Sequence, residues 1–238
     1  MVDTDRWLLP EGIEELLPPE AERLERVRHK LLRLFHTWGY RQVIPPFIEY
    51  LDSLLTGAGN DLDLETFKLT DQLSGRLMGV RADMTPQVAR IDASQMQGEE
   101  PSRLCYLGTV LRTRPASHGG TRSPMQVGVE LYGHAGPESD REVLVLMVDT
   151  LLKAGLEHVH LDLGHVGIFR GLARHAGLDT EMENRFFEAL QRKAKPEINE
   201  LLAAADVGKK AANALAALAD LNGGREVLDE ARSTLADA

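Results

Sequence analysis

The chain has 238 residues, of which 43% are hydrophobic and 27% are charged, and this is the composition of an ordinary globular protein. Its formal net charge of −10 disfavours nucleic acid as a partner, because an acidic surface repels polyphosphate unless a local basic patch overcomes the field. The sequence has no signal-peptide pattern and no apolar run near the ~20 residues of a membrane span, so we expect a cytoplasmic protein with no membrane partner.

The first predicted element is an amphipathic helix over residues 20–38. Apolar residues recur at helical spacing, and acids precede bases along it, as the helix macrodipole favours. Gly39 supplies a stop signal, and a strand over residues 40–44 ends at Pro45-Pro46. The pattern predicts a helix and a strand that pack together.

A hairpin and a short helix follow. Strands are predicted at 67–70 and 76–80, because turn-forming residues separate them. Thr85 then fits an N-cap, with Pro86 at the first helical position of a helix that continues over residues 87–96. Asp83 and Thr85 can serve only as turn and cap residues, or can bind a ligand as well.

The stretch over residues 104–133 predicts an amino-acid site. A strand pattern at 104–111 leads into a basic loop, and a second strand pattern follows in which Gln126 and Glu130 share one face with Gly128. With no bulk between them, this pair suits an ammonium group, and Arg112 can hold a carboxylate in fork geometry. The alternative is a buried polar pair whose hydrogen bonds the loop satisfies. His118 and Arg122 fit either the site or a solvated loop tip.

The chain from residue 138 onward is predicted to be mostly helical. A helix at 138–154, a strand at 158–163 and a helix at 164–176 precede a change to Ala- and Leu-rich sequence. Further helices are predicted at 181–192, 195–205, 209–218 and 225–238. We therefore expect two domains, residues 1–177 and 178–238, and an α+β fold with an antiparallel sheet, flanking helices and a small all-α appended domain.

Cys105, the single cysteine, lies in an apolar strand pattern and is predicted to be a small buried hydrophobe. No histidine, cysteine or carboxylate cluster has metal-ligand spacing, and no cofactor motif is present, so neither a metal nor a cofactor is expected.

Residues 108–133 resemble motif 2 of the class II aminoacyl-tRNA synthetases, and specifically the histidyl enzymes. The resemblance puts Arg112 on the motif arginine, and Gln126 and Glu130 on the pair that holds the α-amino group of histidine. It puts Asp83 and Thr85 on an acid and a threonine that bind the same ligand. Residues 20–49 resemble motif 1, which implies self-association; the alternative is an ordinary helix packed on its own sheet.

One departure from the synthetases bears on catalysis, because Arg114 stands where they carry a glutamate that contacts ATP. With residues 8–21, this change makes the chain look like the regulatory subunits of short-form ATP phosphoribosyltransferase, which are catalytically silent. The resemblance implies no catalytic residues, no tRNA, L-histidine as effector, and a catalytic-subunit partner that joins ATP to phosphoribosyl pyrophosphate. The alternatives are a working histidyl-tRNA synthetase and an assembly module whose site is vestigial.

The resemblance also implies a later strand and a motif 3. The nearest candidate, Gly223-Gly224-Arg225, lacks the motif tyrosine and follows helical patterns. We therefore expect an N-terminal part or an atypically short form, with an open sheet edge that favours self-association.

Overall fold

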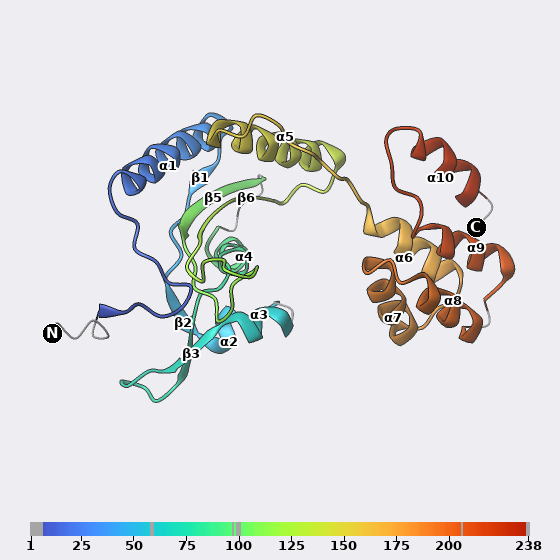
Figure 1. Cartoon of the computed structure of the whole chain (residues 1–238), viewed down its shortest axis with the longest axis horizontal. Helices are drawn as coiled ribbons and strands as arrows, with labels where there is room; N and C mark the ends of the chain where they lie inside the picture. Colours follow the sequence, from blue (N-terminus) through green and yellow to red (C-terminus); the bar gives the residue numbers. More distant parts are fainter. Residues whose placement is uncertain (1–6, 58–59, 97, 99–100, 206, 237–238) are drawn as a thin grey trace. The chain divides into compact units, whose positions relative to one another are not determined.

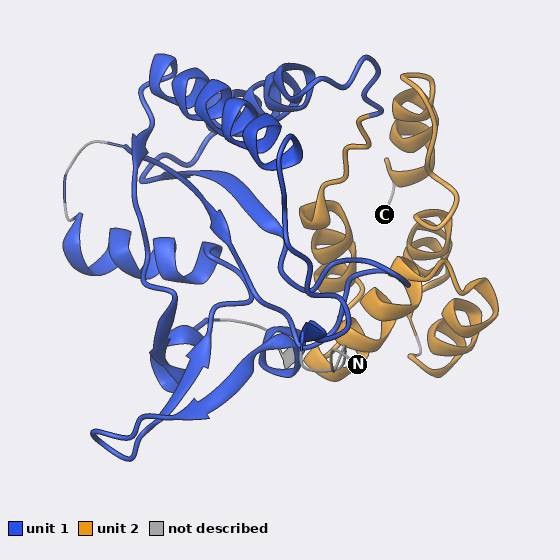
Figure 2. Cartoon of the chain, turned by 60° about the vertical axis from the view of Figure 1, so that its left-hand side comes forward, with its two compact units in different colours: residues 1–160 blue, residues 161–238 orange. Residues whose placement is uncertain are grey.

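The computed structural model describes residues 7–57, 60–96, 98, 101–205 and 207–236. The chain divides into two compact units, residues 1–160 and residues 161–238 (Figure 2). The elements of the first unit are α1 (Glu20–Thr37), β1 (Arg41–Gln42), β2 (Ile48–Tyr50), α2 (Leu51–Leu54), α3 (Asn60–Glu65), β3 (Phe67–Thr70), β4 (Leu77–Val80), α4 (Thr85–Gln95), β5 (Ser102–Thr109), β6 (Met125–Tyr132) and α5 (Pro137–Ala154).

The first unit contains two three-stranded sheets. One has the order β1-β5-β6, with β1 parallel to β5 and β5 antiparallel to β6; the other has the order β2-β4-β3 and is antiparallel throughout. The expected antiparallel sheet is therefore found, with one parallel pair at β1. Arg41 and Gln42 of the expected strand 40–44 form this pair, and the Val43 N–H also donates to the Cys105 carbonyl at 2.9 Å before Pro45 and Pro46, which cannot donate to a ladder.

Helices cover both faces of the β5–β6 hairpin (Figure 1). On one face, Cys105 packs in a buried cluster with residues of α1 and α5, namely Leu31, Phe35 and Leu146, and with Tyr40. On the other face, a second cluster joins Leu104 and Tyr106 to Met84 and Val88 at the start of α4. Cys105 is 2% exposed, as predicted. The period-two alternation of β5 thus divides the apolar residues of the first unit into two buried clusters, one on each face of the hairpin.

The second unit is a helical bundle of α6 (Val166–His175), α7 (Thr180–Gln191), α8 (Lys195–Ala204), α9 (Lys209–Ala217) and α10 (Val227–Leu235). Phe169 of α6 stacks on Phe186 of α7 with 5.9 Å between ring centroids, and Leu215 of α9 joins the same buried core. Helix α6 therefore belongs to the bundle, and the division at residues 160/161 precedes the boundary that we expected at residues 177/178. Gly177 does end α6, at a φ of 73°.

The predicted strand at 158–163 is wrong. Residues 156–165 form neither helix nor strand, and Leu161 and Leu163 are 40% and 69% exposed. Alternating apolar residues predict a strand only where a neighbouring strand is available for pairing, and this segment leads from α5 to the helical unit. None of the helices among the described residues is both long and apolar enough to cross a membrane.

Candidate functional site

The candidate site lies between the start of α4 and the face of the β5–β6 hairpin that α4 covers. In the β5–β6 ladder, Gly108 pairs with Gln126 and Tyr106 with Gly128, so Tyr106, Gln126 and Glu130 share one face. The loop that leads into α4 brings Asp83 and Thr85 to the same face. We call Asp83, Thr85, Tyr106, Gln126 and Glu130 the polar row.

Asp83 organises one end of the polar row. Its Oδ1 accepts hydrogen bonds from the Thr85 backbone N–H at 2.9 Å and from Gln126 Nε2 at 2.7 Å. Gln126 Oε1 accepts from the Met84 N–H at 2.9 Å, so both ends of this amide are engaged and its orientation is determined. Thr85 is the first residue of α4, and its predicted role as N-cap is wrong, because the Asp83 carboxylate binds the free N–H at this helix start.

Tyr106 organises the other end of the polar row. This residue was not predicted from the sequence as part of the site. Its hydroxyl donates to Glu130 Oε1 at 3.1 Å and lies 2.9 Å from Thr85 Oγ1. Each of these two hydroxyls has one proton, and either can be the donor in the contact between Thr85 and Tyr106. A Cβ on Gly128 would lie 2.3 Å from the Tyr106 ring and hydroxyl. The space between Gln126 and Glu130, expected to be open, is therefore filled by this phenol.

The electrostatics of the polar row favour a cationic ligand. Burial raises the pKa of Glu130, and the nearby charge of Asp83 acts in the same direction, while hydrogen bonds from Tyr106 and Thr85 oppose the rise. Burial also raises the pKa of the Tyr106 phenol, which keeps it protonated as a donor. Among the described residues, neither Asp83 nor Glu130 forms an ion pair with a basic side chain. The site thus carries two carboxyl groups with hydrogen bonds but without a countercharge.

Arg112 stands beside the polar row without joining it. Its Nε lies 3.4 Å from the Ala82 carbonyl oxygen, next to Asp83, and 3.6 Å from Glu65 Oε2. The Glu65 side chain is 42% exposed, so this pair is weak and can be exchanged for another anion. The structure therefore brings four of the five predicted site residues into one hydrogen-bonded set and leaves the fifth, Arg112, at its margin.

The remaining basic residues of the loop lie elsewhere. Arg114 and His118 are exposed. Arg122 folds back on the N-terminal segment, where its N–H donates to the Gly12 carbonyl at 2.7 Å and its guanidinium lies over the Phe67 ring. In the part of the chain that the structure describes, no group of three histidine, cysteine or acidic side chains could hold a metal ion.

Comparisons with known proteins identify the family of the chain. A family model described as histidyl-tRNA synthetase matches residues 12–238. An ATP phosphoribosyltransferase regulatory subunit of Thioalkalivibrio sulfidiphilus is 61% identical over 238 residues, and that of Ectopseudomonas mendocina is 60% identical over 238 residues. The matches cover 100% of this chain and 60% of each relative, so the chain spans about three fifths of their length.

The similar solved structures include both kinds of protein. An ATP phosphoribosyltransferase regulatory subunit/histidyl-tRNA synthetase from Bacillus halodurans superposes with a TM-score of 0.83 at 28% identity, over 96% of this chain and 59% of that one. The histidyl-tRNA synthetase of S. aureus superposes with a TM-score of 0.53 at 25% identity, over 63% of this chain and 40% of that one. The resemblance inferred from the sequence motifs is thereby confirmed, and the chain belongs to the histidyl-tRNA synthetase family, within which it is similar to the ATP phosphoribosyltransferase regulatory subunits.

Proposed function

We propose that the chain is the synthetase-like part of a non-catalytic regulatory subunit of ATP phosphoribosyltransferase, and that its polar row binds L-histidine. The observation that carries the ligand is the pair of carboxyl groups, Asp83 and Glu130, that have no basic partner among the described residues. An ammonium group placed between them would supply the missing charge and donate hydrogen bonds to both. Such charge-assisted bonds are about twice as strong as neutral ones.

The second feature of the proposed ligand is its carboxylate. Arg112 lies next to the loop that carries Asp83, and its present partner Glu65 is half-exposed and at 3.6 Å. If the ligand carboxylate replaced Glu65, Arg112 would pair with that carboxylate, and Asp83 and Glu130 would pair with the ammonium group of the same amino acid.

Regulation requires that the ligand bind two states of an assembly with different affinity. The partner that we propose is the catalytic subunit of ATP phosphoribosyltransferase, whose activity the chain would switch on and whose feedback by histidine it would transmit. Self-association through α1 and the segment after it, a cytoplasmic location and the absence of tRNA binding stay predictions. Sedimentation velocity at micromolar concentration tests the self-association.

Isothermal titration tests the ligand. We expect L-histidine to bind, and histidinol, which keeps the amine and the imidazole but lacks the carboxylate, to bind at least about tenfold more weakly because it loses Arg112. Asp83→Asn should weaken both ligands equally, because it alters the amine side of the site. Equal affinity for the two ligands would contradict the role of Arg112, and no heat with either would contradict the site.

A second candidate function is histidine activation as in histidyl-tRNA synthetases, which the presence of Arg112 on the motif 2 position favours. We expect no histidine-dependent ATP–pyrophosphate exchange, because Arg114 replaces an acidic ATP contact. Measurable exchange by the purified protein would make this candidate the better one.

A further inference from the structure

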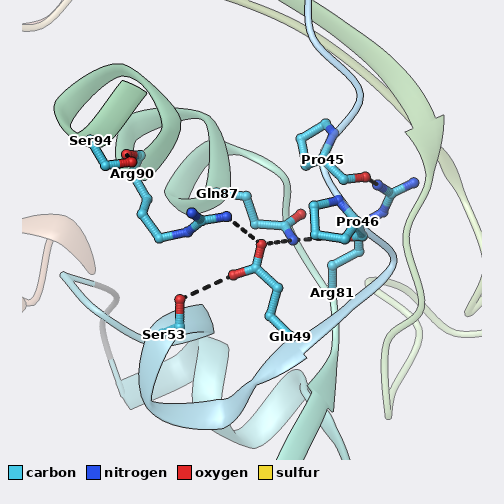
Figure 3. Close-up of polar contacts among 8 residues, drawn as sticks. All are labelled: Pro45, Pro46, Glu49, Ser53, Arg81, Gln87, Arg90 and Ser94. Carbon is cyan, nitrogen blue, oxygen red and sulfur yellow. Dashed lines mark hydrogen bonds and ion pairs between the residues drawn. The ribbon is translucent and has the colours of Figure 1, made fainter. Parts of the chain in front are cut away.

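Residues 45–49 comprise the end of the connection from β1 and the first two residues of β2, and three consecutive carbonyls of this segment accept hydrogen bonds from one stretch of chain. Arg81 Nη1 donates to Pro45 O at 2.8 Å, Gln87 Nε2 donates to Pro46 O at 2.8 Å, and the Arg81 N–H donates to Phe47 O at 3.1 Å. Figure 3 shows the two side-chain contacts. We call residues 45–49 the connecting segment.

Glu49 completes the attachment. Its Oε1 accepts from Arg90 Nη2 at 2.6 Å and from Gln87 Nε2 at 3.0 Å, and its Oε2 accepts from Ser53 Oγ at 3.2 Å (Figure 3). The Glu49 side chain is only 8% exposed, so its charge depends on these partners. Both oxygens are bonded, which holds α4 against the start of α2.

The residues attached in this way flank the candidate site. Arg81 and Gln87 lie on either side of residues 82–86, the site loop, which carries Asp83, the Met84 N–H and Thr85. Arg81 is 8% exposed and also donates from Nε to Thr109 O at 2.9 Å, so it joins the connecting segment to β5. The site loop is therefore fastened at both ends to the same five residues.

Apolar side chains at and beside the connecting segment reach the surface. Ile44 is 81% exposed, Phe47 44% and Ile48 41%, and the Phe47 ring also lies 5.3 Å from the Arg81 guanidinium. A change of position at the site loop must therefore either break these hydrogen bonds or move a segment that reaches the surface. Charge-assisted hydrogen bonds such as that of Arg90 to Glu49 favour the second outcome.

We propose that Arg81, Gln87 and Glu49 are positioning residues that couple occupancy of the polar row to the conformation of the connecting segment. This inference rests on the proposed function, because it concerns the regulation of that same site. It identifies the connecting segment as the element through which a bound amino acid is sensed outside the site, and it places the control of ligand affinity in residues that do not touch the ligand.

Glu49→Gln tests the proposal, because it keeps the shape of the side chain and removes the charge that Arg90 and Gln87 bind. We expect its affinity for L-histidine, measured by titration, to fall about tenfold or more. Arg90→Met removes the same ion pair from its more exposed partner and should act in the same direction, which keeps the test valid if Glu49→Gln fails to fold. Arg90→Lys, which keeps the cation, should retain an affinity within about threefold of the parent.

Glu142→Gln is the matched control. Glu142 makes an ion pair of similar length, 2.7 Å from its Oε1 to Arg103 Nε, on the opposite face of β5. Both this variant and Glu49→Gln should lower the denaturation midpoint, but Glu142→Gln should leave the affinity for L-histidine within about twofold of the parent. A loss of affinity in both variants alike would mean that stability alone is responsible, and the coupling would be wrong.

Hydrogen exchange gives a readout that a purely structural role would not change. Addition of L-histidine to the parent should slow exchange of the amides of Phe47–Tyr50 by about fivefold or more, and saturating L-histidine should not do so in Glu49→Gln. If the parent binds L-histidine and these amides do not respond, the coupling is wrong and the proposed ligand stands. If the parent binds no L-histidine, both are wrong.

Discussion

At the scale of single residues, Glu130 determines the charge of the polar row. Its carboxyl is half-buried, accepts from the Tyr106 hydroxyl at 3.1 Å, and has a raised pKa. A ligand cation stabilises the ionised form and so reverses the effect of burial.

Glu130→Gln should reduce the affinity for L-histidine by about 30-fold, because an ammonium left without its charged partner loses roughly 2 kcal/mol or more. Glutamine still offers Tyr106 an acceptor of the same shape, so the fold should remain intact by circular dichroism. Isothermal titration is the measurement, and Glu157→Gln, an exposed carboxylate outside the site, is the control. Parent-like binding by a folded Glu130→Gln protein would show that the ligand lies elsewhere.

The same residue predicts a pH dependence of stability. The pKa of Glu130 in the folded chain lies above its ordinary value of 4.5, mainly because of burial, so the folded state binds this proton more tightly than the unfolded state does. Its contribution to the free energy of unfolding is therefore complete below pH 4.5 and is lost as the pH rises through the raised pKa. Urea unfolding of the parent and Glu130→Gln at a series of pH values should show the parent losing stability relative to the variant as pH rises over this window. If the free energy of unfolding of the parent instead rose relative to that of the variant with increasing pH, the predicted direction would be wrong.

At the scale of elements, the β5–β6 hairpin depends on a glycine. A Cβ at Gly128 would come 2.3 Å from Tyr106, which is 3% exposed and has no space to retreat into. Gly128→Ala should therefore displace the phenol from Glu130 and Thr85 and cost about 1–3 kcal/mol of folding free energy.

Chemical denaturation measures that cost, and Gly171→Ala is the matched control. Nothing lies within 4 Å of a Cβ at Gly171, which is in the middle of α6, so the control should be neutral or stabilising by up to ~1 kcal/mol. A stable Gly128→Ala protein with unchanged ligand affinity would refute the role of Tyr106 in the polar row.

The sequence predicted those elements whose signals are local. The 67–80 hairpin has its turn chemistry between two short strand patterns, and Asp71 accepts from the Leu73 N–H and the Ser74 hydroxyl as such turns require. The strand at 158–163 was predicted wrongly because alternation does not reveal whether a partner strand exists. The Thr85 cap was wrong because the helix already begins at Thr85, whose own N–H donates to the Asp83 carboxylate.

The polar row was predicted only in part, because one of its members depends on contacts between strands that are not local in the sequence. Period two placed Gln126 and Glu130 on one face, but the role of Tyr106 depends on the register of β5 against β6, which places it opposite Gly128. Arg81 and Glu49 were missed because their partners are 36 and 41 residues away in the chain. A glycine between two polar residues was the one available signal that a large side chain from the neighbouring strand lies over it.

At the scale of the whole molecule, the chain consists of two units with separate cores. Phe169 and Ala173 of α6 pack with Phe186 of α7, whereas residues 156–165 carry no secondary structure. A limited protease should therefore cut first within residues 156–165, where the backbone lacks helix or ladder hydrogen bonds.

Mass spectrometry of the fragments locates the cut, and circular dichroism of the C-terminal fragment should show only helix. We expect residues 177–179 to resist cleavage, because Leu178 packs on the helical core and Asp179 caps α7 through a 2.8 Å bond to the Met182 N–H. First cleavage at Gly177 would restore the boundary that the sequence suggested.

The single thiol of the molecule offers a further use. Cys105 is 2% exposed between α1, α5 and the hairpin, and burial raises its pKa to about 11. Near pH 8 only about one molecule in a thousand would carry the reactive thiolate, even if a reagent could reach it. Modification of Cys105 by a thiol reagent should therefore proceed only when the core of the first unit opens. The rate of modification then measures the rate of unfolding, and no other probe has to be added. If a surface cysteine is engineered into the chain, a thiol-reactive dye should label that position and not Cys105 while the chain stays folded.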